Sequence, residues 1–164
     1  PYRGARLTPD GERVALEVIR HHRLLEAYLA DVLGMPWDRV HDEAEVLEHY
    51  ISEELEERIA AALGDPSRDP HGDPIPDRDL AVAAEPAVPL AELRAGGRGT
   101  FARVSDSDPE MLRYLDERGI RPGAELRVAR REPFGGSLAI EVDGRDHTIG
   151  ADLAQRMLVS AGPR

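Results

Sequence analysis

The sequence contains no cysteine, no lysine and no asparagine, and only 4% of its 164 residues are aromatic. The lack of cysteine excludes disulfides and thiolate metal sites, and it is typical of a cytosolic protein. No apolar run approaches the roughly 20 residues that span a bilayer, and no charged-then-apolar leader opens the chain. We therefore expect a cytoplasmic protein whose core consists mainly of Leu, Val, Ile and Ala.

Negative charge is what the sequence has in excess. The net charge is −11, which argues against the chain as it stands lying on DNA, because binding to DNA depends on neutralising phosphates. The excess is greatest in HDEAEVLEHYISEELEE, residues 41–57, which holds eight acidic residues, two histidines and no arginine. Such a segment is suited to cations.

Two amphipathic helices are predicted in the first half of the chain. Thr8 is a good N-cap and Pro9 is tolerated in the first turn, so one helix is expected to run from there to about Leu33. Apolar residues at i, i+4 spacing predict a second helix over 42–63. A core of this size is small, so a homodimer would bury more apolar area.

The second half of the chain has a different pattern. Six prolines between residues 65 and 89 predict a linker. From residue 90 onward, short alternating segments with glycine turns predict a small β-barrel. The fold class is therefore α+β, with a helical dimerisation domain followed by a small SH3-like β-barrel. The expected divisions are 1–8, 9–64, 65–89 and 90–164.

Carboxylates and histidines recur at helical spacing within the acidic segment. Glu45, Glu48 and His49 stand at i, i+3 and i+4, so on a helix they point the same way. Close carboxylates repel one another and raise each other's pKa values, and a bound divalent cation removes that cost.

A second set of nitrogen and oxygen donors is expected from both helices. His22 and Glu26 are spaced i, i+4, and His41 stands just before the second helix, so antiparallel packing would bring the three together. Donors of this kind suit Mn²⁺, Fe²⁺ and related first-row ions, while selectivity must come from geometry and supply.

Plainer interpretations compete with both sites. Acidic residues on a helix are usually a solvated face, and a His–Glu pair at i, i+4 is more often a surface ion pair. The remaining histidines are assigned to surface positions: His21, His71 and His147.

Four motifs in residues 7–77 resemble the diphtheria-toxin-repressor family of metal-dependent transcription regulators. They are LT-x-x-G, HHRLLE, VHDEAE-x-LEH-x-IS and P-H-G-x-PIP, in matching order and spacing. From residue 90 the chain resembles the SH3-like domain of longer family members and the FeoA type of iron-transport protein, through GIRPGAEL, a GG turn and LAQRMLV.

The resemblance implies a homodimer that binds operator DNA when Fe²⁺ or Mn²⁺ is abundant and represses metal-uptake genes. It implies two metal sites, with these ligands: His22, Glu26 and His41 in one, and Glu45, Glu48 and His49 in the other. Glu45 stands where iron-type members usually carry Cys, which favours manganese. The SH3-like domain is expected to add Glu110, with Asp106, Ser107 or Asp108 as a second ligand.

One part of the family pattern is missing. Family members begin with a winged helix-turn-helix, of which only PYRGARL, residues 1–7, resembles the last strand of the wing. We therefore expect a metal-sensing and dimerising part of a repressor, unable to read an operator alone and with an incomplete Glu45/Glu48/His49 site. The alternative is a stand-alone metal-binding adaptor of FeoA type that acts on a metal transporter. A metallohydrolase is disfavoured because no nucleophile or poised base is recognisable, so no enzyme is predicted.

Overall fold

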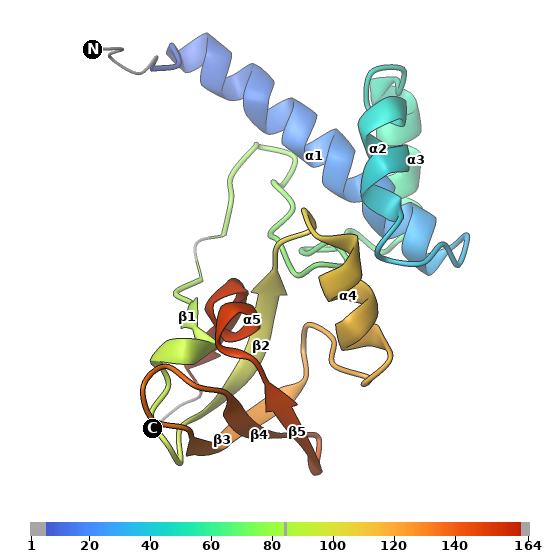
Figure 1. Ribbon diagram of the computed structural model, residues 1–164. Coiled ribbons are helices and arrows are strands. Elements are labelled where there is room, and N and C mark those ends of the chain that lie inside the picture. Colours follow the sequence, from blue (N-terminus) through green and yellow to red (C-terminus); the bar gives the residue numbers. More distant parts are fainter. Residues whose placement is uncertain (1–5, 84, 162–164) are drawn as a thin grey trace. The chain divides into compact units, whose positions relative to one another are not determined.

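The chain folds into two compact units. The computed structural model describes residues 6–83 and 85–161 (Figure 1). The first unit comprises residues 1–69 and 74–83, and the second comprises 70–73 and 84–164. The predicted wing strand at residues 1–7 falls mostly outside the described residues.

Three helices form the first unit, with these bounds: α1 Pro9–Asp31, α2 Val40–Leu47 and α3 Glu53–Ala62. The start of α1 is as predicted, since the Thr8 side chain accepts a hydrogen bond from the Gly11 N–H at 3.1 Å and Pro9 occupies the first turn. In Figure 1, α1 runs beside α2 and α3. This packing of α1 against the two shorter helices positions the candidate site.

The single helix predicted over 42–63 is wrong, because residues 48–52 separate α2 from α3. Ser52 caps the new helix, and its hydroxyl accepts a hydrogen bond from the Leu55 N–H at 3.3 Å. The acidic residues that follow Ser52 favour a helix start, because carboxylates are stabilised near the positive end of the helix dipole. The i, i+4 spacing of apolar residues continues across this break, so the apolar pattern alone does not reveal it.

The core of the first unit is aliphatic, and part of the predicted linker contributes to it. The buried set is Leu24, Leu25, Leu29, Val40, Ala44, Ile59, Ala60 and Ile75. Arg20 and Arg23 of α1 each donate a hydrogen bond of 2.6 Å to a backbone carbonyl of this proline-rich segment, at Pro76 and Pro74 respectively. Residues 74–83 are therefore part of the helical unit rather than a free spacer.

The second unit is a six-stranded antiparallel sheet of order β1-β6-β2-β3-β4-β5. Its strands are β1 Val88–Pro89, β2 Arg98–Val104, β3 Glu125–Arg131, β4 Leu138–Val142, β5 Arg145–Ile149 and β6 Met157–Ala161. Its helices are η1 Leu90–Glu92, α4 Pro109–Asp116 and α5 Ala151–Arg156. The short strands predicted from residue 90 onward are present, which agrees with the α+β class. The sequence RDHTI of β5 has little apolar character, and that strand was not predicted.

The assignment of His71 to the surface is wrong, because its side chain is 1% exposed. Its carbonyl accepts a hydrogen bond from the Val104 N–H of β2 at 3.0 Å. The next residue, Gly72, has φ +88°, and a Cβ there would lie 2.0 Å from the Ala102 carbonyl oxygen. Close backbone approach to β2 therefore requires glycine at this position. No helix within 6–83 or 85–161 is long and apolar enough to span a membrane.

Candidate metal centre

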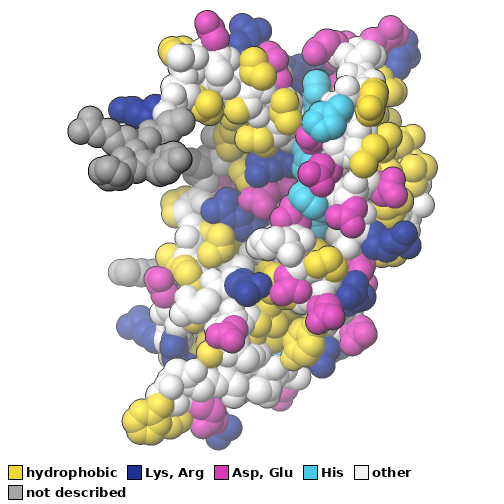
Figure 2. Space-filling model, turned by 45° about the horizontal axis from the view of Figure 1, so that its top comes forward, with side chains coloured by type: hydrophobic (Ala, Val, Ile, Leu, Met, Phe, Trp, Pro, Cys, Tyr) yellow, Lys and Arg dark blue, Asp and Glu magenta, His cyan; other side chains and the backbone are white. Residues whose placement is uncertain are grey.

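Three of the predicted ligands meet between α1 and α2. His22 and Glu26 lie one turn apart on α1, and His41 lies in the first turn of α2. The His22 Nε2 atom is 3.1 Å from Glu26 Oε1 and 3.1 Å from His41 Nδ1, and the latter two atoms are 3.3 Å apart. Figure 2 shows histidine and acidic side chains side by side on one face.

This triangle of donor atoms fits a first-row divalent ion. Protein nitrogen and oxygen donors lie about 2.1 Å from such an ion, which places neighbouring donors about 3.0 Å apart at right angles and about 3.4 Å apart in a tetrahedron. The observed separations of 3.1 to 3.3 Å lie within that interval. The spacing therefore fits such an ion, but it does not distinguish octahedral from tetrahedral coordination.

The charged groups of the site are partly or fully buried, so each needs an opposite charge nearby. The Glu26 side chain is 1% exposed, and those of His22 and His41 are 17% and 38% exposed. Burial alone would lower the pKa of His22, but the hydrogen bond and charge of Glu26, followed by those of Glu48, outweigh it and raise the pKa of His22 to about 9. The buried carboxylate is thus balanced by a protonated imidazole, which a cation can replace.

Glu48 orients the His22 ring from the side opposite the triangle. Glu48 Oε2 lies 2.7 Å from His22 Nδ1, which leaves Nε2 of the same ring facing Glu26 and His41. Ligand histidines commonly donate their second N–H to a carboxylate in this way, which fixes the ring and increases its basicity. The structure thus places Glu48, a predicted ligand of the other set, beside the first set.

The structure does not gather Glu45, Glu48 and His49 around one point. Glu45 is exposed on α2, while His49 lies beyond the helix end, with Nε2 3.9 Å from Glu48 Oε1. Among the described residues, these three are not a group whose ligand atoms all lie within 4.8 Å of one another. The second site stays a prediction.

The ligands predicted in the SH3-like domain lie at the start of α4. Glu110 is exposed in the first turn of that helix. Asp108 caps the helix, accepts a hydrogen bond from the Met111 N–H at 3.1 Å and pairs with Arg156 at 3.2 Å. Ser107 lies 2.8 Å from Ser105, hydroxyl to hydroxyl. Asp108 is thus engaged within its own unit, and the role of Glu110 stays a prediction.

His21, predicted to lie at the surface, is half-buried and pairs with α3. Its side chain is 13% exposed, and its Nε2 lies 2.8 Å from Glu56 Oε2 of α3. Arg20 binds the other oxygen of the same carboxylate. Successive residues on a helix point about 100° apart, so Arg20 and His21 reach α3 while His22 reaches α2. Nothing local in the sequence indicated Glu56 as their partner.

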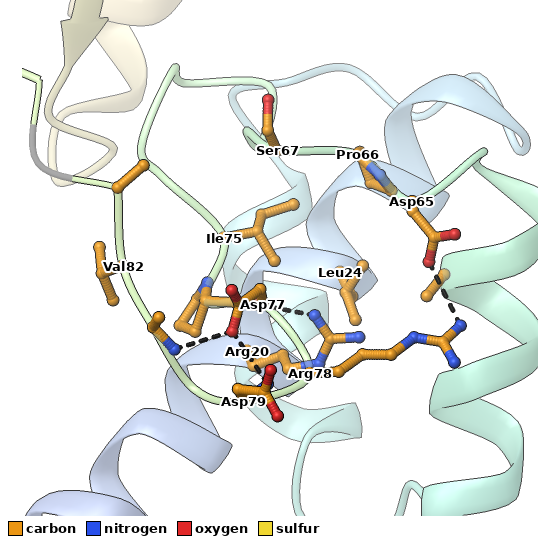
Figure 3. A pocket seen from close by; sticks show the side chains of 14 residues that line it. Arg20, Leu24, Asp65, Pro66, Ser67, Ile75, Asp77, Arg78, Asp79 and Val82 are labelled. Carbon is orange, nitrogen blue, oxygen red and sulfur yellow. Dashed lines mark hydrogen bonds and ion pairs between the residues drawn. The ribbon is translucent and has the colours of Figure 1, made fainter.

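A cavity of about 560 Å³ lies elsewhere in the first unit, between α1, α3 and residues 65–83 (Figure 3). Its floor includes the buried side chains of Leu24 and Ile75. Two of its polar side chains are bonded to protein: Arg20 donates to the Pro76 carbonyl, and the Asp77 carboxylate accepts two backbone N–H bonds of 2.9 Å. Among the described residues, none that lines this cavity belongs to a group of possible metal donors.

Two families match successive parts of the chain. Residues 8–77 match the family described as iron dependent repressor, metal binding and dimerisation domain, and residues 88–161 match the FeoA domain. The iron-dependent repressor IdeR of Mycobacterium tuberculosis is 35% identical over 167 residues, covering 93% of this chain and 71% of that protein. The diphtheria toxin repressor of Corynebacterium diphtheriae is 32% identical over 167 residues, covering 96% and 73%.

Solved structures give a similar result. A manganese-dependent transcriptional repressor in complex with manganese superposes with a TM-score of 0.90 and 48% identity, covering 96% of this chain and 75% of that one. The IdeR of T. acidophilum superposes with a TM-score of 0.81 and 32% identity, covering 96% and 72%. These similarities extend through both units.

Proposed function

The chain belongs to the family of iron-dependent and diphtheria-toxin repressors, and on that premise we propose that His22, Glu26 and His41 form its metal sensor. It is a metal-dependent transcriptional regulator that uses Mn²⁺ or Fe²⁺. The observation that supports the sensor is the convergence of one carboxylate oxygen and two imidazole nitrogens within 3.3 Å of one another. Two of these donors come from α1 and one from α2, so an ion bound by all three would hold the two helices together.

Manganese is the ion that we propose for this site. The donors are nitrogen and oxygen, without a thiolate. Glu45 stands where the family resemblance places cysteine in iron-type members, and the 48% identity to a manganese-dependent repressor supports the same assignment. The bound ion supplies positive charge beside a carboxylate that is 1% exposed.

The residues around the ion link its binding to the packing of α1 against α2. Glu26 provides the buried negative charge, and His22 must give up the proton that its raised pKa retains at neutral pH. Glu48 holds the His22 ring while this happens. Donors divided between α1 and α2 then favour one packing of the two helices, which is a shift between pre-existing states.

Homodimerisation and operator binding complete the proposed function. Exposed apolar side chains on the first unit are suited to an interface between two copies: Val14, Val18, Val46, Leu47 and Tyr50. The relatives are repressors by name and extend beyond the matched region. We propose that the form extended to their length binds operator DNA as a dimer in the cytoplasm, without enzymatic activity.

A DNA-binding measurement tests this function. Fluorescence anisotropy of a labelled promoter fragment is recorded with an upstream-extended form, with and without Mn²⁺. We expect Mn²⁺ to tighten binding at least tenfold, and His41→Ala to remove the effect while the control His147→Ala keeps it. Binding that is insensitive to metal would contradict the proposal.

A second candidate is the FeoA-type adaptor, which the match of residues 88–161 to the FeoA domain favours. It predicts that the chain, as it stands, binds a metal transporter. The anisotropy experiment separates the two, because an adaptor gives no metal-dependent DNA binding in the extended form.

A further inference from the structure

The β3–β4 hairpin of the second unit ends in an unusual turn. The Gly136 N–H donates to the Pro133 carbonyl at 3.2 Å. The two residues between them, Phe134 and Gly135, both have positive φ, +60° and +73°. This is the pattern of a type I′ turn, whose central positions favour Asn, Asp and Gly.

Phe134 is costly at this tip in two ways. Its backbone occupies the left-handed region, which is unfavourable for a residue with a bulky side chain. Its side chain is fully exposed, at 105%. Asn or Gly would avoid both costs, and a residue that breaks local preference without compensation in its own fold indicates a function outside it.

The charge around the tip is weakly positive. Arg130 pairs with Glu132 at 2.8 Å, and the Arg131 guanidinium donates to the Leu93 carbonyl. Two arginines and one glutamate are too few for the several phosphate contacts that nucleic acid binding requires. A protein surface with an apolar hollow and acidic rim fits this tip better.

The same unit has such a hollow between α4 and α5. It is an open groove of about 510 Å³. Its apolar lining is Met111, Tyr114 and Leu153. Its charged rim is Asp108, Glu110, Asp152 and Arg156, with a net charge of −2. Within the described residues, neither Glu110 nor Asp152 has an ion-pair partner.

We propose that Phe134 of one copy of the chain inserts into the α4–α5 groove of a second copy. The tip carries an exposed aromatic ring and a weak positive charge, whereas the groove has an apolar floor and an acidic rim, so polarity and charge are complementary. The groove receives the ring from another copy, because the Phe134 side chain of its own copy is fully exposed. Such a tip-to-groove contact closes a pair or links dimers in series.

Sedimentation velocity of the whole chain in EDTA tests this contact apart from the metal site. We expect the wild-type chain to associate beyond the species formed by Phe134→Asn as concentration rises. Asn tolerates positive φ, so this variant keeps the hairpin while losing the ring. Loss of the ring should weaken association at least tenfold. Identical sedimentation of the two proteins at every concentration would overturn the proposal.

Charge and mixing experiments locate the two halves of the contact. Asp152→Arg should weaken association, and adding Arg130→Asp to it should restore association by exchanging the charges. A mixture of Phe134→Asn, which keeps a groove, with Asp152→Arg, which keeps a tip, should associate more than either variant alone. Failure of both rescues, or Phe134-dependent binding to duplex DNA or anionic vesicles in place of self-association, would overturn the proposal.

Discussion

At the scale of single residues, His22 connects most of the candidate site. Its Nε2 faces Glu26 and His41, its Nδ1 faces Glu48, and its pKa is raised to about 9. At pH 7 the ring is therefore protonated, and a metal ion must displace that proton to reach Nε2. Metal affinity should then depend on pH through this one group.

Mn²⁺ affinity is predicted to rise as pH increases from 7 toward 9. The sign follows from the raised pKa, because each step toward 9 increases the fraction of chains in which His22 is neutral. Well below the pKa, the increase is about tenfold per pH unit. Anaerobic calorimetry in buffers of different ionisation enthalpy should show release of about one proton at pH 7. Buffer-independent heats would contradict this assignment.

At the residue scale, spacing along one helix predicted the proximity of His22 and Glu26. His22 and Glu26 were paired by their i, i+4 spacing, and His41 was added on the assumption that the helices pack antiparallel. The orientation of Glu48 toward His22, the burial of His71 and the His21–Glu56 contact were missed, because each depends on partners distant in sequence. Contacts between residues that are far apart in the sequence depend on how the chain folds, and local spacing does not predict them.

At the scale of elements, the break between α2 and α3 determines the direction in which the side chains of the acidic segment, residues 41–57, project. It sets the predicted ligands Glu48 and His49 outside regular helix, and Ser52 then restarts the chain as α3. Helix patterns were predictable from apolar periodicity, whereas this interruption was not, because the periodicity persists through it. A serine followed by acidic residues was the available signal.

Ser52→Ala is predicted to destabilise the first unit by about 1 kcal/mol, because it removes the hydroxyl that accepts from the Leu55 N–H. Thr8→Ala is the matched cap variant on α1, where the hydroxyl accepts from Gly11. Urea unfolding measures both free energies of unfolding. If Ser52→Ala unfolds like the wild type while Thr8→Ala is destabilised, Ser52 does not define the start of α3.

At the scale of the whole molecule, the proposed metal donors and the single tryptophan lie in the same unit. Trp37 is the only tryptophan in the chain, and its side chain is 1% exposed. Its fluorescence therefore reports unfolding of the helical unit. The two-part architecture itself was predictable from the change of sequence pattern, while the packing of residues 74–83 on the helices was not.

Mn²⁺ is predicted to raise the melting temperature reported by Trp37 fluorescence. At a free concentration one hundred times Kd, binding adds about 2.7 kcal/mol of stability, which corresponds to several degrees. His22→Ala with His41→Ala should abolish the rise, and His147→Ala in the other unit should retain it. A rise that survives loss of both ligands would place the ion elsewhere.

The most direct measurement is a titration of Mn²⁺ into the chain, with the free ion followed by its electron paramagnetic resonance signal. The wild-type chain should bind one tight equivalent, and His22→Ala/His41→Ala should bind none at the same concentrations. Equal tight binding by the two proteins, or none by the wild type, would contradict the assignment of His22, Glu26 and His41 as the metal sensor.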